Sequence, residues 1–320
     1  MTPRGETSMV PPPEFESYYG RQIIKTPTWK TPDVPLYLFL GGMGGASAVL
    51  AEVAASSGRP DLERVARVTA AGSAALGTVA LVHDLGRPDR FLNMLRVLKP
   101  TSPLSVGSFI LAPFASLSGA AAASFLTGRL PRLGRLAGVG AAALGPPLAT
   151  YTGALLANTA VPAWHEARHH LPFVFVGSAA TAAAGLGLLT APTSETGPVR
   201  RAAVGGAAVE LAASSAMEHG TGLAGETFHD GTAGRLLRAA KACTAVGAAG
   251  AAVLGGRSRF AAGLSGLALL AGSALTRFGI FAAGQASTRD PKYTVVPQRE
   301  RLAEKGGVEG AGLPARRSTG

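Results

Sequence analysis

Three ionisable residues interrupt long uncharged stretches of this chain, and they are its first candidates for chemistry. Glu52, Glu210 and Arg277 lie within or near the ends of apolar segments long enough to cross a membrane. A charge at such depth is costly unless it is paired, neutralised or placed in a water-filled cavity. Glu210 is the deepest, so we expect either a role in proton movement or a structural ion pair. Glu52 is close enough to a segment end to reach water, and Glu218 is the expected counter-ion of Arg277.

The histidines are the second candidate set. Imidazole titrates near neutral pH and can bind metals when neutral. The run HEARHH at 165–170 could hold a metal, but a solvated interfacial loop is the simpler interpretation, and we predict no metal in this chain. No two histidines lie at opposing depths of two apolar segments, and CxxCH is absent, so we predict no haem. The single cysteine excludes a disulfide framework and a cysteine-ligated iron–sulfur cluster.

The uncharged stretches predict the elements that position these residues. Only 15% of the residues are charged, whereas soluble domains carry about 25%. The predicted fold class is an all-α integral membrane protein with eight transmembrane helices, rich in the small residues that allow close helix packing in lipid. The predicted spans lie near residues 35–56, 64–84, 103–127, 136–157, 171–190, 200–219, 237–256 and 260–283.

An even number of spans places both termini on one face of the membrane, which we call the terminal face. The loops at 85–102, 158–170 and 220–236 lie on it too, and all six histidines fall on or near it. Trp29 and Trp164 also fall there, as expected of an interfacial aromatic belt. We therefore predict one face that reacts or docks partners and one plain face.

The segments outside the spans set the domain limits and the orientation. Residues 1–34 form a polar N-terminal segment, and residues 284–320 are predicted to be a flexible C-terminal tail. The short turns of the plain face are densely basic, so the positive-inside rule places that face in the cytoplasm and both termini on the extracytoplasmic side. The net charge of +11 belongs to loops and tails against membrane lipid, and its scatter argues against nucleic acid binding.

Three motifs, in this order, resemble the NrfD/polysulfide-reductase membrane-subunit family. They are TPTWKTPDVPLYLFLGGMGGA (26–46), HDLGRPDRFLNMLRVLKPTSPLSVGSFIL (83–111) and YTGALLANTAVPAWHEARHHLPFVFVGSAA (151–180). The resemblance extends over residues 18–290 and agrees with eight predicted spans.

The resemblance implies a function. Such subunits are haem-free, quinone-binding membrane anchors of molybdopterin/iron–sulfur oxidoreductase complexes in prokaryotic plasma membranes. They exchange electrons between a ferredoxin-type iron–sulfur subunit and membrane quinone, here expected to be menaquinone, and do not act alone on the soluble substrate. A formate dehydrogenase-like catalytic subunit is a guess. The resemblance also implies two four-helix bundles, a quinone-binding one over 35–157 and a second over 171–283.

The resemblance further implies which residues contact the quinone head. Asp33 and Tyr37 match polar positions at the start of the first span, and their i, i+4 spacing places them on one helix face. Tyr151 matches a tyrosine of the fourth span. Gly41 and Gly42 would allow a helix to approach closely beside the ring.

A loop signature after the second span completes the implied site. His83, Asp84 and Arg87 match it. Either an Asp84–Arg87 pair fixes the loop, or His83 and Asp84 relay protons to and from the quinone.

Two other functions stay open at this stage. A secondary transporter or proton-conducting protein would use Glu52, Glu210 and Arg277 along its path. Such proteins often contain inverted repeats and broken helices; no convincing repeat is present, although the Gly-Pro-Pro at 145–147 is expected to break the fourth span. A scaffold that anchors partners without binding quinone is the third possibility.

Overall fold

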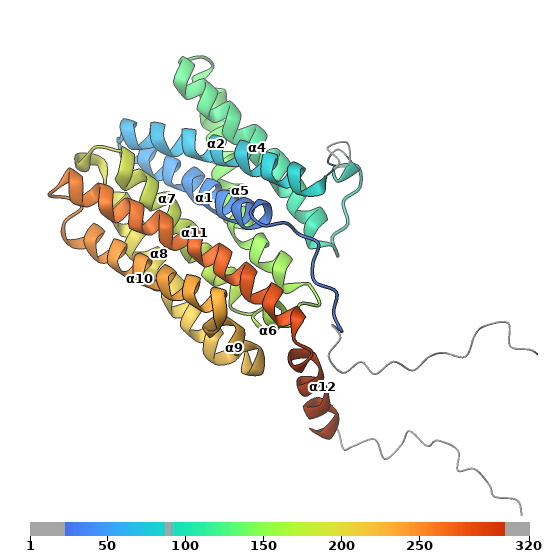
Figure 1. The fold of residues 1–320 in the computed structure, drawn as a ribbon. Helices are drawn as coiled ribbons and strands as arrows, with labels where there is room; N and C mark the ends of the chain where they lie inside the picture. The colour runs from blue at the N-terminus through green and yellow to red at the C-terminus, as the bar shows by residue number, and fades with distance from the viewer. Residues whose placement is uncertain (1–22, 87–90, 92, 305–320) are drawn as a thin grey trace, which may run out of the picture.

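The computed structural model describes residues 23–86, 91 and 93–304 (Figure 1). Its regular structure in these ranges is entirely helical, and eight long helices form the body. They are α1 (Asp33–Ser56), α2 (Pro60–Leu85), α4 (Pro103–Thr127), α5 (Pro131–Ala157), α7 (Leu171–Thr190), α8 (Gly197–Gly220), α10 (Gly231–Val253) and α11 (Arg259–Arg289). Short helices connect or follow them: α6 (Pro162–Glu166), η1 (Thr193–Glu195), η2 (Gly222–Gly225), α9 (Glu226–His229) and α12 (Lys292–Glu304).

Six of the long helices are long and apolar enough to cross a membrane. They are α1, α2, α4, α7, α10 and α11. This confirms an all-helical, multi-pass membrane protein. Helices α5 and α8 have the length, but Gly-Pro-Pro in α5 and the charges of α8 dilute their apolar character.

Proline and glycine explain why several helix ends were predictable. Proline occupies the first turn of α2, α4, α5 and α7, where its missing N–H costs no hydrogen bond. Gly86 and Gly128 end α2 and α4 in the left-handed conformation. The predicted spans 103–127 and 171–190 coincide with α4 and α7.

The predicted flexible tail begins at residue 284, whereas the structure is largely helical as far as residue 304. Helix α11 continues to Arg289, and α12 follows it. The end of α11 is held in place because Ser287 accepts a hydrogen bond of 3.2 Å from the backbone N–H of Ala163 on α6. The polar and charged residues at the end of α11 therefore remain helical because this segment packs on α6.

The expected break at Gly145-Pro146-Pro147 is also absent, because α5 is one continuous helix through both prolines. Neighbouring helices often stabilise prolines in membrane helices. Here α5 packs directly on α1 at this point. A Cβ on Gly45 would lie 2.5 Å from the carbonyl oxygen of Gly145, and one on Gly145 would overlap Gly45 in the same way.

Helix α1 is the centre of the packing (Figure 1). It packs most extensively against α2 and α5, and also against α7 and α11. Helices α4 and α5 form a further close pair, as do α7 and α8, and α10 and α11. Helix α1 together with α5 thus faces α7 and α8 across a boundary that we call the seam.

The Gly45–Gly145 contact leads to a stability prediction. Gly45→Ala forces a methyl group into the backbone of α5, so it should destabilise the protein by about 1–3 kcal/mol through overpacking. Gly41→Ala is the matched control, because a Cβ there meets nothing within 4 Å. Thermal unfolding in detergent measures both. Equal melting temperatures for the two variants would contradict the close contact.

Glu52 does not extend freely to water, contrary to the expectation from its position. Its carboxylate lies 2.9 Å from Arg67 of α2 and 3.4 Å from Arg135 of α5. Arg67 is buried and also lies 2.7 Å from Glu63. This network ties the plain-face ends of three helices together.

Candidate functional site

The start of α1 and the end of α2 bring an acid and a base together. Nδ1 of His83 lies 2.7 Å from Oδ2 of Asp33. Asp33 is mostly buried and begins α1, where a carboxylate faces the positive end of the helix dipole. The His83 side chain is 74% exposed and lies in the last turn of α2. The contact therefore joins a solvent-accessible imidazole to a mostly buried carboxylate.

The other loop-signature residues have separate places. Oδ1 of Asp84 accepts a hydrogen bond of 2.8 Å from the backbone N–H of Lys30, which fixes the chain before α1 onto the end of α2. Asp84 thus has a positioning contact. Arg87 lies outside the described residues, so the proposed Asp84–Arg87 pair has no structural test.

A hollow of about 560 Å³ opens beside the Asp33–His83 pair. Thr78, Val79 and Val82 of α2 form its apolar wall, and His83 and Lys30 stand at its polar end. Val79 is 65% exposed, so the hollow is reached from the outer side of α2. A flat apolar molecule with a polar head matches this arrangement of side chains.

The two predicted tyrosines are buried, and each packs on a glycine. A Cβ on Gly77 of α2 would lie 3.6 Å from the Tyr37 ring, and a Cβ on Gly107 of α4 would overlap the ring of Tyr151. Both tyrosines belong to one buried cluster that includes side chains of α1, α2, α4 and α5. Among the described residues, none forms a hydrogen bond with the hydroxyl of Tyr37 or Tyr151, so both groups can donate to a ligand.

Gly41 and Gly42 of α1 do not face the same neighbour, as they would if both lay beside one quinone ring. A Cβ on Gly42 would lie 3.0 Å from Nη2 of Arg277 and 3.2 Å from Ala179, so this residue makes room for α11 and α7. The placement of Gly42 beside the quinone stays a prediction, and its contacts in the structure are with α7 and α11. A Cβ on Gly41 would meet nothing within 4 Å, and this residue lies on the α2 side of the helix, near Gly77.

Trp164 is not part of an interfacial belt, since it is fully buried. Its indole N–H donates to the carbonyl of Ile280 at 2.8 Å, and its ring stacks on Trp29 at 5.7 Å between centroids. Gly284 of α11 provides the space, because any Cβ there would overlap the indole. The stack fixes the chain before α1 against α6 and α11.

A second polar centre lies between α7, α8 and α11. The carboxylate of Glu210 is buried and accepts hydrogen bonds from the hydroxyls of Thr276 at 2.7 Å and Thr181 at 3.1 Å. The hydroxyls of Ser178 and Ser273 lie 2.8 Å apart between α7 and α11. The hydroxyl donors and the nearby Arg277 thus stabilise the buried carboxylate of Glu210.

Arg277 is fully buried in the same region. Its Nη2 donates to the carbonyl of Phe175 at 2.8 Å, and its guanidinium carbon lies 3.7 Å from the centre of the Phe175 ring. Nε and Nη1 have no partner among the described residues. A cation in this position is stabilised by the ring and by attraction to Glu210 rather than by a direct ion pair.

Glu218 is not the counter-ion of Arg277. It forms an ion pair of 2.5 Å with Lys241 and lies 3.9 Å from His229. Helix α11 ends at Arg289 rather than near 283, so Arg277 is about 18 Å from its end at 1.5 Å per residue. Glu218 lies in the last turn of α8 and cannot reach that depth.

Comparison with known protein families gives one match. Residues 24–196 match the family model described as polysulphide reductase, NrfD. The chain belongs to the NrfD family. This confirms the resemblance seen in the sequence, over a shorter range. A comparison with curated proteins found no match.

NrfD proteins are membrane subunits of quinone-interacting oxidoreductase complexes, with iron–sulfur and molybdoenzyme subunits as their general partners. The matched range contains Asp33, Tyr37, His83 and Tyr151, which lie in α1, α2 and α5. Glu210 and Arg277 lie beyond it. The family match therefore covers the Asp33–His83 site and leaves the second polar centre without a family assignment.

Some contacts of the candidate site were not predicted. The Asp33–His83 pair follows from antiparallel packing of α1 and α2, which brings the start of one helix to the end of the next. The sequence offered that signal in the short 57–59 turn between them. Thr181 and Thr276 gave no signal, because hydroxyls are common in membrane helices. Within the described ranges, no group of three or more His, Cys, Asp or Glu side chains could hold a metal ion.

Proposed function

We propose that this chain is the haem-free membrane anchor of a molybdopterin/iron–sulfur oxidoreductase complex and exchanges electrons between an iron–sulfur partner and membrane quinone, menaquinone in particular. The observation that carries this proposal is the Asp33–His83 pair at the polar end of an apolar hollow. It lies inside the range that matches the NrfD family.

The residues present fit a quinone. A quinone head needs hydrogen-bond donors for its carbonyls, and its reaction moves two electrons with two protons. His83 can hold a proton at either ring nitrogen, and Asp33 stabilises the imidazolium and orients the ring. Tyr37 lies one helical turn below Asp33 and can donate from its hydroxyl. The apolar wall of Thr78, Val79 and Val82 would take the start of the tail.

The membrane topology is part of the proposal. All eight long helices would cross the membrane, as a first four-helix bundle over 35–157 and a second over 171–283. Arginines in the turns of the plain face, such as Arg59, Arg129 and Arg257, support a cytoplasmic position for the plain face. Both termini and the quinone site would then lie on the extracytoplasmic side of a prokaryotic plasma membrane.

A docking area for the iron–sulfur subunit is proposed on the terminal face. Val97 and Leu98 are more than half exposed, and Leu104 is 42% exposed. Val97 and Leu104 line a hollow of about 470 Å³ together with Arg96 and Lys99. An apolar centre with a charged rim is typical of protein interfaces. A ferredoxin-type subunit there would be close to the quinone hollow, and a formate dehydrogenase-like catalytic subunit beyond it is one option.

The test is electron transfer in the intact complex. The complex is purified in mild detergent, its partners and metals are identified, and menaquinol- or quinone-linked turnover is measured. Quinone-linked turnover supports the proposal. A complex that assembles with this chain and shows no such turnover would show a scaffold instead.

The role of Tyr151 can be tested by changing Gly107, the glycine on which its ring packs. Gly107→Ala drives a methyl group into the Tyr151 ring and displaces its hydroxyl, so quinone-linked turnover should fall by roughly 10- to 100-fold, as expected for a displacement of about 1 Å. Gly119→Ala on the same helix is the control, because it meets nothing within 4 Å. If the two variants retain equal turnover, Tyr151 has no place in the quinone site.

A second candidate function rests on Arg277 and Glu210. A buried guanidinium with two unpartnered nitrogens beside a buried carboxylate is also expected in a transporter or a proton-conducting protein. Proton or solute flux through the isolated chain in liposomes would favour it. The absence of flux, together with quinone turnover in the complex, would exclude it.

A further inference from the structure

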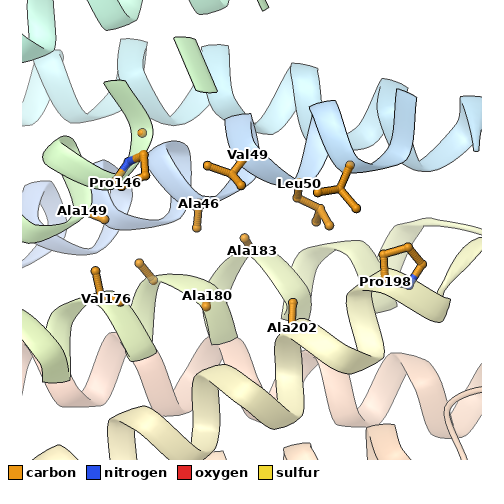
Figure 2. Close-up of a pocket in the computed structure, with 13 residues that line it drawn as sticks. Ala46, Val49, Leu50, Pro146, Ala149, Val176, Ala180, Ala183, Pro198 and Ala202 are labelled. Carbon is orange, nitrogen blue, oxygen red and sulfur yellow. The ribbon is translucent and has the colours of Figure 1, made fainter. Parts of the chain in front are cut away.

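An apolar groove of about 270 Å³ lies in the seam (Figure 2). Ala46, Val49 and Leu50 of α1 face Ala183 of α7 across it, and Ala202 of α8 lies at one side. Every residue that lines the groove is Ala, Val, Leu, Gly or Pro. No lining side chain can form a hydrogen bond, so the occupant must be a hydrocarbon.

The size of the groove limits the occupant further. Its volume is about nine times the ~30 Å³ that one water molecule occupies. A helix of a partner protein is about 10 Å across and does not fit. A single alkyl chain does. The walls come from α1, α5, α7 and α8, and α1 and α7 are long and apolar enough to cross a membrane, so alkyl chains of lipids would surround the groove.

Cationic side chains stand at one end of the groove. Pro198 lines this end, at the start of α8. Nη2 of Arg59 lies 4.0 Å from the Cβ position of Gly197, the residue before it. Arg201 follows Pro198 by three residues, so it lies on a neighbouring part of the same helix face, and it is exposed.

The nearby acids do not neutralise these two arginines. Glu52 is held by Arg67, and Oε2 of Glu195 accepts a hydrogen bond of 2.8 Å from the backbone N–H of Leu62. In the described part of the chain, neither Arg59 nor Arg201 forms an ion pair. The end of the groove therefore carries positive charge that complements an anionic headgroup.

We propose that the seam binds one anionic phospholipid, with an acyl chain in the groove and the phosphate beside Arg59 and Arg201. A quinone tail is a poorer match, because the Asp33 and Tyr37 side of α1 faces α2, whereas Ala46, Val49 and Leu50 face α7 and α8. The lipid would fill the space between the two sets of helices. It is a site separate from the quinone hollow.

The first part of the test asks whether lipid binding depends on the charge of the headgroup and of the two arginines. The full-length chain is delipidated in detergent, and binding of phosphatidylglycerol and of phosphatidylcholine with the same acyl chains is followed by native mass spectrometry. We expect tighter binding of phosphatidylglycerol. Arg59→Gln with Arg201→Gln should weaken its binding by roughly 30-fold, since each basic residue near an anionic lipid contributes a factor of about five. Arg257→Gln, an exposed arginine elsewhere on the same face, is the control.

The second part of the test asks whether lipid binding requires an open groove. Ala202→Leu fills it from α8, whereas Ala208→Leu adds the same side chain at an exposed position of that helix. Ala202→Leu should abolish the lipid adduct and Ala208→Leu should retain it, with both melting temperatures confirming folded protein. Equal lipid binding by the two leucine variants, or equal binding of the two phospholipids, would overturn the proposal. So would loss of bound menaquinone, rather than phospholipid, in Ala202→Leu.

Discussion

His83→Gln in the intact complex is expected to lower quinone-linked turnover by about 100-fold or more, because a positioned general acid or base contributes 10²–10⁴-fold. Glutamine keeps a hydrogen-bonding side chain of similar length but cannot take up a proton. Its amide can still contact Asp33, which His83 meets at 2.7 Å. The loss would therefore report proton transfer rather than the position of α2.

The control for this experiment is His169→Gln, which changes another exposed histidine of the same face. We expect it to leave turnover unchanged. Asp33→Asn should lower turnover as well, and His83→Gln in that background should add little, because the two side chains act as one unit. Additive losses would show that they act separately. Normal turnover of His83→Gln would remove the histidine from the site.

Arg277→Met is expected to destabilise the protein by about 3–5 kcal/mol, because it leaves the buried carboxylate of Glu210 without the cation that lies nearby. The guanidinium is fully buried, contacts the Phe175 carbonyl and ring, and stabilises the nearby Glu210. Methionine fills a similar volume without charge. Thermal unfolding of the purified chain in detergent measures the change.

Two further variants separate charge from packing. Arg277→Met with Glu210→Gln removes both charges and should recover most of the lost stability, because the carboxylate then no longer needs a cation. Lys292→Met breaks an exposed pair with Glu226, and it should change the melting temperature far less than Arg277→Met does. If the double variant is no more stable than Arg277→Met alone, the guanidinium acts through its packing on Phe175 and Gly42.

The sequence was sufficient for the all-helical class of the protein and for several of the helix ends. Charge-free stretches predict helices, and proline and glycine mark where α2, α4 and α7 begin or end. It was insufficient where packing decides. The last turns of α11 are polar in sequence, but Ser287 and Gly284 hold them on α6.

The candidate site likewise has residues that the sequence predicts and contacts that only packing decides. Asp33, Tyr37 and Tyr151 are identifiable from the family motifs, yet their neighbours are not. Gly42 and Gly45 belong to one short glycine-rich run, and the geometry of α1 turns the first toward α11 and the second toward α5. Local sequence does not show which neighbour a glycine faces, because the neighbouring helices lie far away in the sequence.

The central position of α1 has a consequence for biogenesis. It is the first long helix of the described chain to enter the membrane during synthesis, and its neighbours include α11, the last of the eight. The face that carries Gly42 meets Ala179 of α7 and gains its last partner only when Arg277 of α11 is inserted. The nascent protein must therefore keep α1 in lipid or beside an insertase with its small-residue faces open. Truncation before α11 would leave those faces exposed to membrane proteases.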